Sequence, residues 1–176
     1  NTGALFVGSG VATGGRGGMV SISVGSGTSG TGGAVSVLSG RSTVNSGGSL
    51  SMQSGEGTAT SSGVISVRTA NAGTTGVSGR LVFSSGSAMS GNSGGLFVGS
   101  GVATGGRGGM VSISVGSGTS GSGGALSVLS GRSTVTSGGA LSVQSGEGTA
   151  TSSGVISIRS ANAGAAGVSG RLVFSS

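Results

Sequence analysis

A short pattern that recurs every fifteen residues constrains this chain more than any other feature. In its clearest copy, residues 33–40 (GAVSVLSG), a glycine precedes a run in which apolar and polar residues alternate. The pattern returns fifteen residues later over 48–55, and again from Gly63. Alternation over so short a run, bounded by glycines, predicts a β-strand with Val35 and Val37 on one face and Ser36 on the other.

Glycine occupies the position before the run in every copy of the repeat. These glycines are Gly3, Gly18, Gly33, Gly48, Gly63, Gly79, Gly94, Gly109, Gly124, Gly139, Gly154 and Gly170. The steps are fifteen residues long, except for a step of sixteen from Gly63 to Gly79 and its equivalent from Gly154 to Gly170. A position that always takes glycine indicates either a positive φ or a close approach of the backbone to its surroundings. We therefore expect a tight corner at each of them.

Two apolar columns follow each of these glycines and form the predicted core. The first column is Leu5, Val20, Val35, Leu50, Ile65, Leu81, Leu96, Val111, Leu126, Leu141, Ile156 and Leu172. The second is Val7, Ile22, Val37, Met52, Val67, Phe83, Val98, Ile113, Val128, Val143, Ile158 and Phe174. The column between them, which includes Ser21, Ser36, Ser51 and Ser66, should face water.

The repeats predict an all-β fold, a parallel β-solenoid of about twelve coils with fifteen residues each. A fifteen-residue unit cannot bury its own apolar face, and its strands lie too close in sequence for a crossover helix. A second period of 91 residues divides the rod into residues 1–91, with six coils, and 92–176, with six coils of which the last is truncated. Of the 85 positions compared at this shift, 74 are identical. A coil of thirty residues with two copies of the repeat is the alternative.

The composition excludes an ordinary globular domain and also a flexible linker. The chain has 176 residues, of which 45 are glycine and none is proline, and only 2% are aromatic. Low charge and regularly placed apolar residues argue against disorder, because a Gly/Ser linker has no reason to keep such a register. No apolar run reaches the eighteen residues of a membrane span, so none is predicted.

The side chains needed for catalysis are nearly absent, so we expect that the chain is not an enzyme. It has no His, Asp, Lys, Cys or Tyr, and its only carboxylates are Glu56 and Glu147. No serine can therefore be activated by a base, and neither a catalytic residue nor a metal site is expected. The segment 25–30 (GSGTSG) fits a dinucleotide-binding GxGxxG pattern, but no helix or ribose-binding acid follows it, so no cofactor is expected.

The net charge of +6 comes from eight arginines and two glutamates. Nucleic-acid binding would need a concentrated basic stripe, and single-strand binders add stacking aromatics. The four aromatic residues are all phenylalanine, and the arginines are spread along the chain. Gly15–Gly18 (GRGG) resembles an RGG element of RNA-binding tails, but it occurs only twice. We expect no nucleic-acid partner.

A ladder of threonines fifteen residues apart offers a different function. It consists of Thr13, Thr28, Thr43, Thr58, Thr104, Thr119, Thr134 and Thr149. Fifteen-residue coils with threonine ladders resemble the insect antifreeze β-solenoids, whose flat Thr-x-Thr ranks bind ice. Here only Thr58 with Thr60, and Thr149 with Thr151, complete the pair. The resemblance implies an ice- or glycan-binding surface as the alternative function.

The Gly-Gly-x-Val-Ser-Val-x-Ser-Gly repeats resemble those of secreted or cell-surface fibre proteins, of the kind found in algae and diatoms, and those of repeat-built adhesins. This resemblance covers the whole chain. It implies a structural protein that forms or decorates an extracellular filament, surface hair or fibre. The localisation it implies is extracellular or at the cell surface.

Self-association is the expected partnership, both sideways and end to end. The outward serine column is interrupted by apolar residues that would form lateral contacts beside two arginines. These candidate contacts are Phe6, Arg80, Val82, Phe97, Arg171 and Val173. In a solenoid, Val82 and Phe97 would lie on adjacent coils. Neither end of the sequence carries a proline or charge cluster that would cap an open β-edge, which favours end-to-end stacking.

Overall fold

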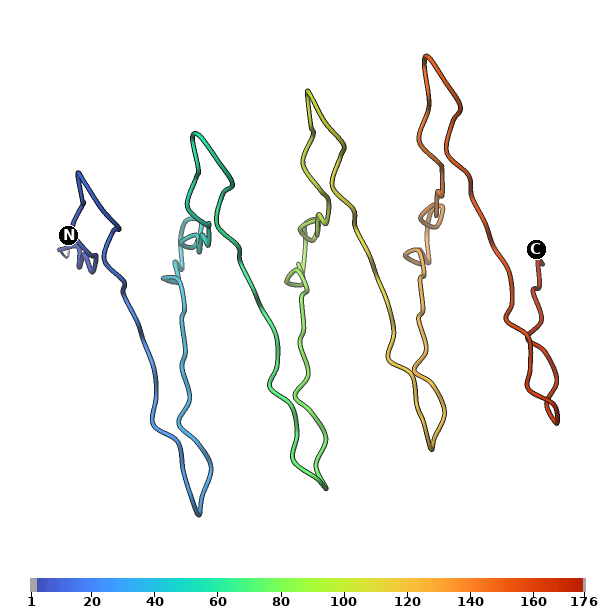
Figure 1. The fold of residues 1–176 in the computed structure, drawn as a ribbon, viewed down its shortest axis with the longest axis horizontal. Coiled ribbons are helices and arrows are strands. Elements are labelled where there is room, and N and C mark those ends of the chain that lie inside the picture. Colours follow the sequence, from blue (N-terminus) through green and yellow to red (C-terminus); the bar gives the residue numbers. More distant parts are fainter. Residues whose placement is uncertain (1–2, 176) are drawn as a thin grey trace. The chain divides into compact units, whose positions relative to one another are not determined.

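The computed structural model describes residues 3–175, and this part of the chain contains neither a helix nor a β-strand (Figure 1). The chain separates into two units, Asn1–Ser93 and Gly94–Ser176. Their boundary lies two residues beyond the one expected from the 91-residue repeat. Each unit is a succession of extended segments joined by narrow loops.

A bend interrupts the chain about every fifteen residues, in step with the sequence repeat. In the first unit the bends occupy 13–15, 28–30, 43–45, 58–60, 74–75 and 89–91. In the second they occupy 104–106, 119–121, 134–136, 149–151 and 165–167. The short period of the sequence thus appears in the structure as a period of turns.

Most loops are closed at a neck by one backbone hydrogen bond between two glycines. Gly48 donates its N–H to the carbonyl oxygen of Gly40 at 2.8 Å, and Gly63 donates to Gly55 at 2.9 Å. The same bond joins Gly33 to Gly25 in the first unit. Its equivalents in the second unit join Gly124 to Gly116, Gly139 to Gly131 and Gly154 to Gly146. The donor is always a glycine of the recurrent column, and the acceptor lies eight residues before it.

Serine hydroxyls supply further contacts within the loops. The Ser9 hydroxyl donates to the carbonyl oxygen of Gly18 at 2.8 Å, and Ser100 makes the equivalent bond to Gly109 at 2.9 Å. Inside the loop 40–48 the Ser42 oxygen accepts the N–H of Asn45 at 2.9 Å. Small polar side chains that bond to nearby backbone groups favour turns over regular structure. The abundance of serine therefore supports these loops locally.

The predicted all-β parallel β-solenoid of about twelve coils is wrong, because the described residues form no sheet. Parallel coils would need backbone hydrogen bonds between residues about fifteen positions apart. Every backbone hydrogen bond of the described residues instead spans nine positions or fewer. In the first unit, the bend 13–15 lies at the upper end of the drawn loop and the bend 28–30 at the lower end (Figure 1). Fifteen residues therefore do not return the chain to the same place.

The predicted core is wrong for the same reason. Val37 and Ile113, expected to be buried between coils, are 68% and 73% exposed. No residue of the described chain is buried, and the lowest exposure among the large apolar side chains is 44%, at Val115. The accessible surface is 17371 Å², whereas a compact protein of this mass exposes about 7,000 Å² and its extended chain about 23,000 Å². The single chain leaves its apolar face uncovered.

Most of the recurrent glycines lie where the two limbs of a loop, the extended segments on either side of its bend, approach each other. No described glycine has a positive φ, so the left-handed alternative is wrong. A Cβ on Gly109 would lie 3.0 Å from Ser100 Cβ, and one on Gly139 would lie 3.3 Å from the backbone nitrogen of Gly131. A Cβ on Gly3 would meet no atom within 4 Å. Close approach explains the glycine at the necks, where a side chain would push the limbs apart.

The glycine inside the loop 146–154 provides a test of this loop geometry. A Cβ on Gly148 would lie 2.5 Å from the carbonyl oxygen of Ser152, which the backbone cannot accommodate without opening the loop. We expect Gly148→Ala to weaken the bond from the Gly154 N–H to Gly146, and amide exchange of Gly154 to accelerate roughly fivefold. Gly146→Ala is the matched control, because a Cβ there meets nothing within 4 Å. Equal exchange in both variants would refute the closed loop.

Candidate functional site

The two carboxylates of the chain occupy equivalent loops of different units. Glu56 follows the neck glycine of the loop 55–63, and Glu147 has the same place in the loop 146–154 of the other unit. Within residues 3–175 no three metal-ligating side chains gather. The hydroxyl of Ser133 accepts the N–H of Thr136 at 2.9 Å, so this serine stabilises a turn.

Within residues 3–175 no helix has the length and apolar character needed to cross a bilayer.

The predicted threonine ladder has an unexpected place in the structure. Each of its eight members, Thr13, Thr28, Thr43, Thr58, Thr104, Thr119, Thr134 and Thr149, is the first residue of a bend and is exposed. A flat rank would need these side chains to be stacked on paired strands, which the described chain lacks. The threonines therefore stand on separate loop tips.

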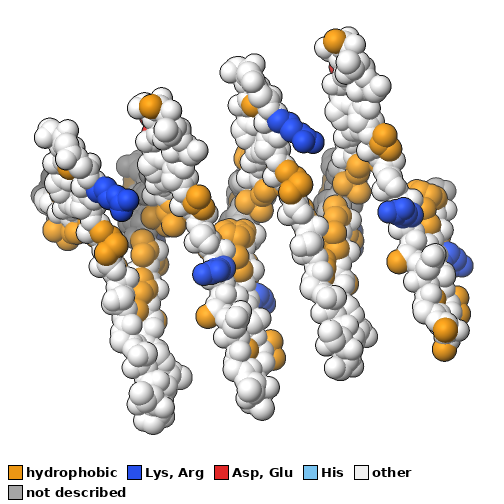
Figure 2. Space-filling model, viewed as in Figure 1, with side chains coloured by type: hydrophobic (Ala, Val, Ile, Leu, Met, Phe, Trp, Pro, Cys, Tyr) orange, Lys and Arg blue, Asp and Glu red, His pale blue; other side chains and the backbone are white. Residues whose placement is uncertain are grey.

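The predicted lateral contacts are all exposed. Phe97 and Phe6 are more than nine-tenths exposed, and Val82 and Val173 are 60% and 58% exposed. Phe6, Arg80 and Val82 belong to the first unit, whereas Phe97, Arg171 and Val173 belong to the second. Figure 2 shows apolar side chains along the loops of the visible face, without a covering layer. Whether these residues make contacts between chains stays a prediction, and residues 1, 2 and 176 at the predicted end-to-end contacts lie outside the described part.

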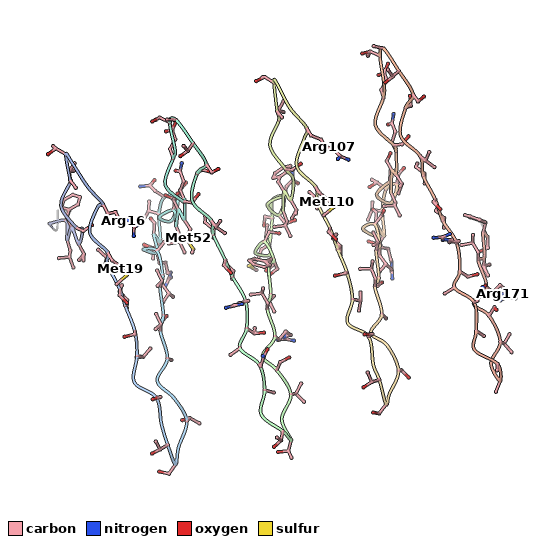
Figure 3. All side chains as sticks on the ribbon, viewed as in Figure 1. Arg16, Met19, Met52, Arg107, Met110 and Arg171 are labelled. Carbon is pink, nitrogen blue, oxygen red and sulfur yellow. The ribbon has the colours of Figure 1, made fainter. Side chains whose placement is uncertain are left out.

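Both units repeat the same arrangement of charged and apolar side chains. Arg16 and Met19 lie on the limb that follows the first bend, and Arg107 and Met110 occupy the equivalent place in the second unit (Figure 3). Met19 and Met110 are 87% and 86% exposed. The 91-residue duplication has therefore reproduced not only the sequence but also the local surroundings of its side chains.

The fifth loop of the first unit, around the bend 74–75, contains a group that the sequence analysis did not single out. Residues 68–71, Arg68, Thr69, Ala70 and Asn71, line a hollow of about 350 Å³. Thr69 Cβ lies 3.3 Å from where a Cβ on Gly79 would stand, so the two residues face each other across the neck. Arg68 and Arg80 flank this neck, one on each limb. The sixteen-residue step from Gly63 to Gly79 was the signal that marked this loop as different.

Within residues 3–175 every large apolar side chain is exposed, and so are the arginines, which recur at equivalent positions after 91 residues. Such a surface can bind a partner by burying apolar area and by attracting negative charge to its arginines. Comparison of the chain with protein-family models, with curated proteins and with solved structures found no match.

Proposed function

We propose that this chain is a structural protein, a building block of an extracellular filament, surface hair or fibre that associates with further copies of itself. The observation that carries the proposal is the exposure of every large apolar side chain in residues 3–175. Large exposed apolar surfaces on soluble chains mark contacts with partners. The chain alone does not cover this surface, so a partner is needed to do so.

A second copy of the chain is the partner that fits the apolar pattern best. Two apolar side chains recur in each fifteen-residue repeat, and the whole series recurs after 91 residues. A copy of the same chain presents the same spacing, so apolar side chains of the two copies meet at many positions at once. Full burial of one Val, Leu or Ile contributes about 1.5–3 kcal/mol. Many such contacts would offset the entropy lost when two chains associate.

The composition supports a structural role over a catalytic one. With neither His, Lys nor Cys in the chain, general acid–base and thiol chemistry lack their usual groups. The resemblance of the repeats to secreted and cell-surface fibre proteins supports a location outside the cell. The alternative, ice or glycan binding through the eight threonines, has less support because the threonines lie on separate bends.

Concentration-dependent assembly tests the proposal. The purified chain should pass from slowly sedimenting monomers to large species as its concentration rises, and negative-stain images of the large species should show thin fibres. Thermal hysteresis should be absent from the dispersed chain. A monomer that persists at high concentration would overturn the filament function, and ice shaping by that monomer would favour the threonine surface instead.

A further inference from the structure

Two arginines flank the neck of the fifth loop in each unit. In the second unit Gly170 donates its N–H to the carbonyl oxygen of Ala161 at 3.3 Å, which closes the loop 161–170. Ser160 Cβ lies 3.2 Å from where a Cβ on Gly170 would stand. Arg159 immediately precedes Ser160, and Arg171 immediately follows Gly170. The two limbs therefore bring one arginine each to the same neck.

The first unit shows the same close approach, flanked by two arginines, at the equivalent positions. Thr69 faces Gly79 at 3.3 Å, with Arg68 before the former and Arg80 after the latter. The hollow of about 350 Å³ begins at Arg68 and runs along the same limb to Asn71. The Asn71 amide and the Thr69 hydroxyl add hydrogen-bonding groups beside the Arg68 guanidinium. Charge, neighbouring polar groups and a concave surface coincide in this loop.

These four arginines are half of the positive charge in the chain, and all four are exposed. The nearest carboxylate in sequence, Glu56, belongs to the preceding loop 55–63, and Glu147 has the equivalent place before the loop 161–170. Like charges on facing segments repel each other. An anionic ligand would remove this repulsion, and a guanidinium binds carboxylate and sulfate oxygens in a bidentate manner.

We propose that the necks of the loops 70–79 and 161–170 bind the anionic groups of an acidic polysaccharide, its carboxylates or its sulfates. A polysaccharide fits better than a nucleic acid because the chain has no Trp or Tyr and only four Phe on which bases could stack. Each unit supplies one such neck, so the chain contains two copies of the proposed site.

The experiment measures binding of the dispersed full-length chain to alginate, which carries carboxylates, and to dextran sulfate. Uncharged dextran and a single-stranded oligothymidylate serve as comparison ligands. We expect binding to at least one acidic polysaccharide, weakening as salt rises, and no binding to dextran. The polymer that binds more tightly identifies the anionic group. Tighter binding to the oligonucleotide than to both polysaccharides would overturn the proposal.

Two variants that lose the same net charge separate a site from general electrostatic attraction. The neck variant carries Arg68→Ser, Arg80→Ser, Arg159→Ser and Arg171→Ser. The control variant carries Arg16→Ser, Arg41→Ser, Arg107→Ser and Arg132→Ser. We expect the neck variant to bind about 10- to 100-fold more weakly, and the control to lose less than about fivefold. Equal losses of affinity in the neck variant and the control variant would refute a specific site at the necks.

This inference does not depend on filament formation, because binding is measured at concentrations where the chain is dispersed. Failure of both polysaccharides to bind the parent chain would overturn the polysaccharide site and leave the structural role untouched. Failure of the parent to assemble at high concentration would overturn the structural role and leave the binding result intact.

Discussion

Replacement of Val20, Ile22, Val111 and Ile113 by serine is expected to raise the concentration at which the chains associate by more than about 100-fold. These residues belong to the two apolar columns of the second repeat in each unit, and their exposure ranges from 50% to 81%. Burial of each against a partner would contribute about 1.5–3 kcal/mol. Loss of even half of the total corresponds to more than two orders of magnitude in an equilibrium constant.

The same substitutions should leave the isolated chain almost unchanged. An exposed side chain makes few contacts that its removal could break, so surface substitutions alter stability by about 0.5 kcal/mol or less. Circular dichroism of the dispersed variant should therefore match that of the parent. Sedimentation velocity across a concentration series measures the expected change in association.

The control for this prediction changes the alternate residues of the same segments. Ser21→Ala, Ser23→Ala, Ser112→Ala and Ser114→Ala lie on the opposite side of the two extended runs, because alternate residues of an extended chain point to opposite sides. We expect the four-alanine control to associate at the same concentration as the parent. If the serine and alanine variants behave alike, the apolar columns do not form the contact.

Val82→Ser combined with Phe97→Ser is expected to reduce sideways association of filaments by about 10- to 100-fold. Phe97 is 96% exposed and Val82 is 60% exposed, in a column that is mostly serine. Aromatic side chains contribute more than most others when an interface covers them. Negative-stain images of the double variant should show single thin fibres where the parent shows bundles.

Val11→Ser combined with Val102→Ser is the matched control for the lateral contact. Both valines are 97% exposed, and they lie in the first loop of their units, outside the serine column. This control should bundle as the parent does. Loss of bundling in both double variants would show that general surface hydrophobicity drives the association, and bundling of Val82→Ser with Phe97→Ser would refute the lateral contact.

The sequence alone determined the periodicities of this protein. The fifteen-residue repeat predicted a tight corner at each recurrent glycine; the bends keep that spacing, but those at 28–30 and 43–45 begin five residues before Gly33 and Gly48, so the predicted corner position is wrong. The hydrogen bond of Ser9 to Gly18 recurs 91 residues later between Ser100 and Gly109. Recurrent glycine predicted close approach at positions such as Gly48, which the necks contain. These features are local, so they follow from residues near each other in sequence.

The arginine necks were only partly accessible to sequence analysis. The sixteen-residue step to Gly79 marked the fifth loop as irregular, and Arg80 was named for a different reason, as a lateral contact. Nothing in the pattern, however, indicated that Arg68 and Arg80 flank one neck. That placement depends on which residue Thr69 faces across the loop, and alternation of apolar and polar residues does not specify a facing partner.

Only the tertiary structure decided which parts of the chain the extended segments pair with. Alternation fixes which side chains share a side of a segment, but a solenoid also requires each segment to pair with the next copy fifteen residues on. In the structure the chain closes on itself after eight residues instead, as between Gly55 and Gly63. A shorter loop costs less entropy to close, and glycines without side chains let its two limbs meet. These local closures leave the apolar columns exposed.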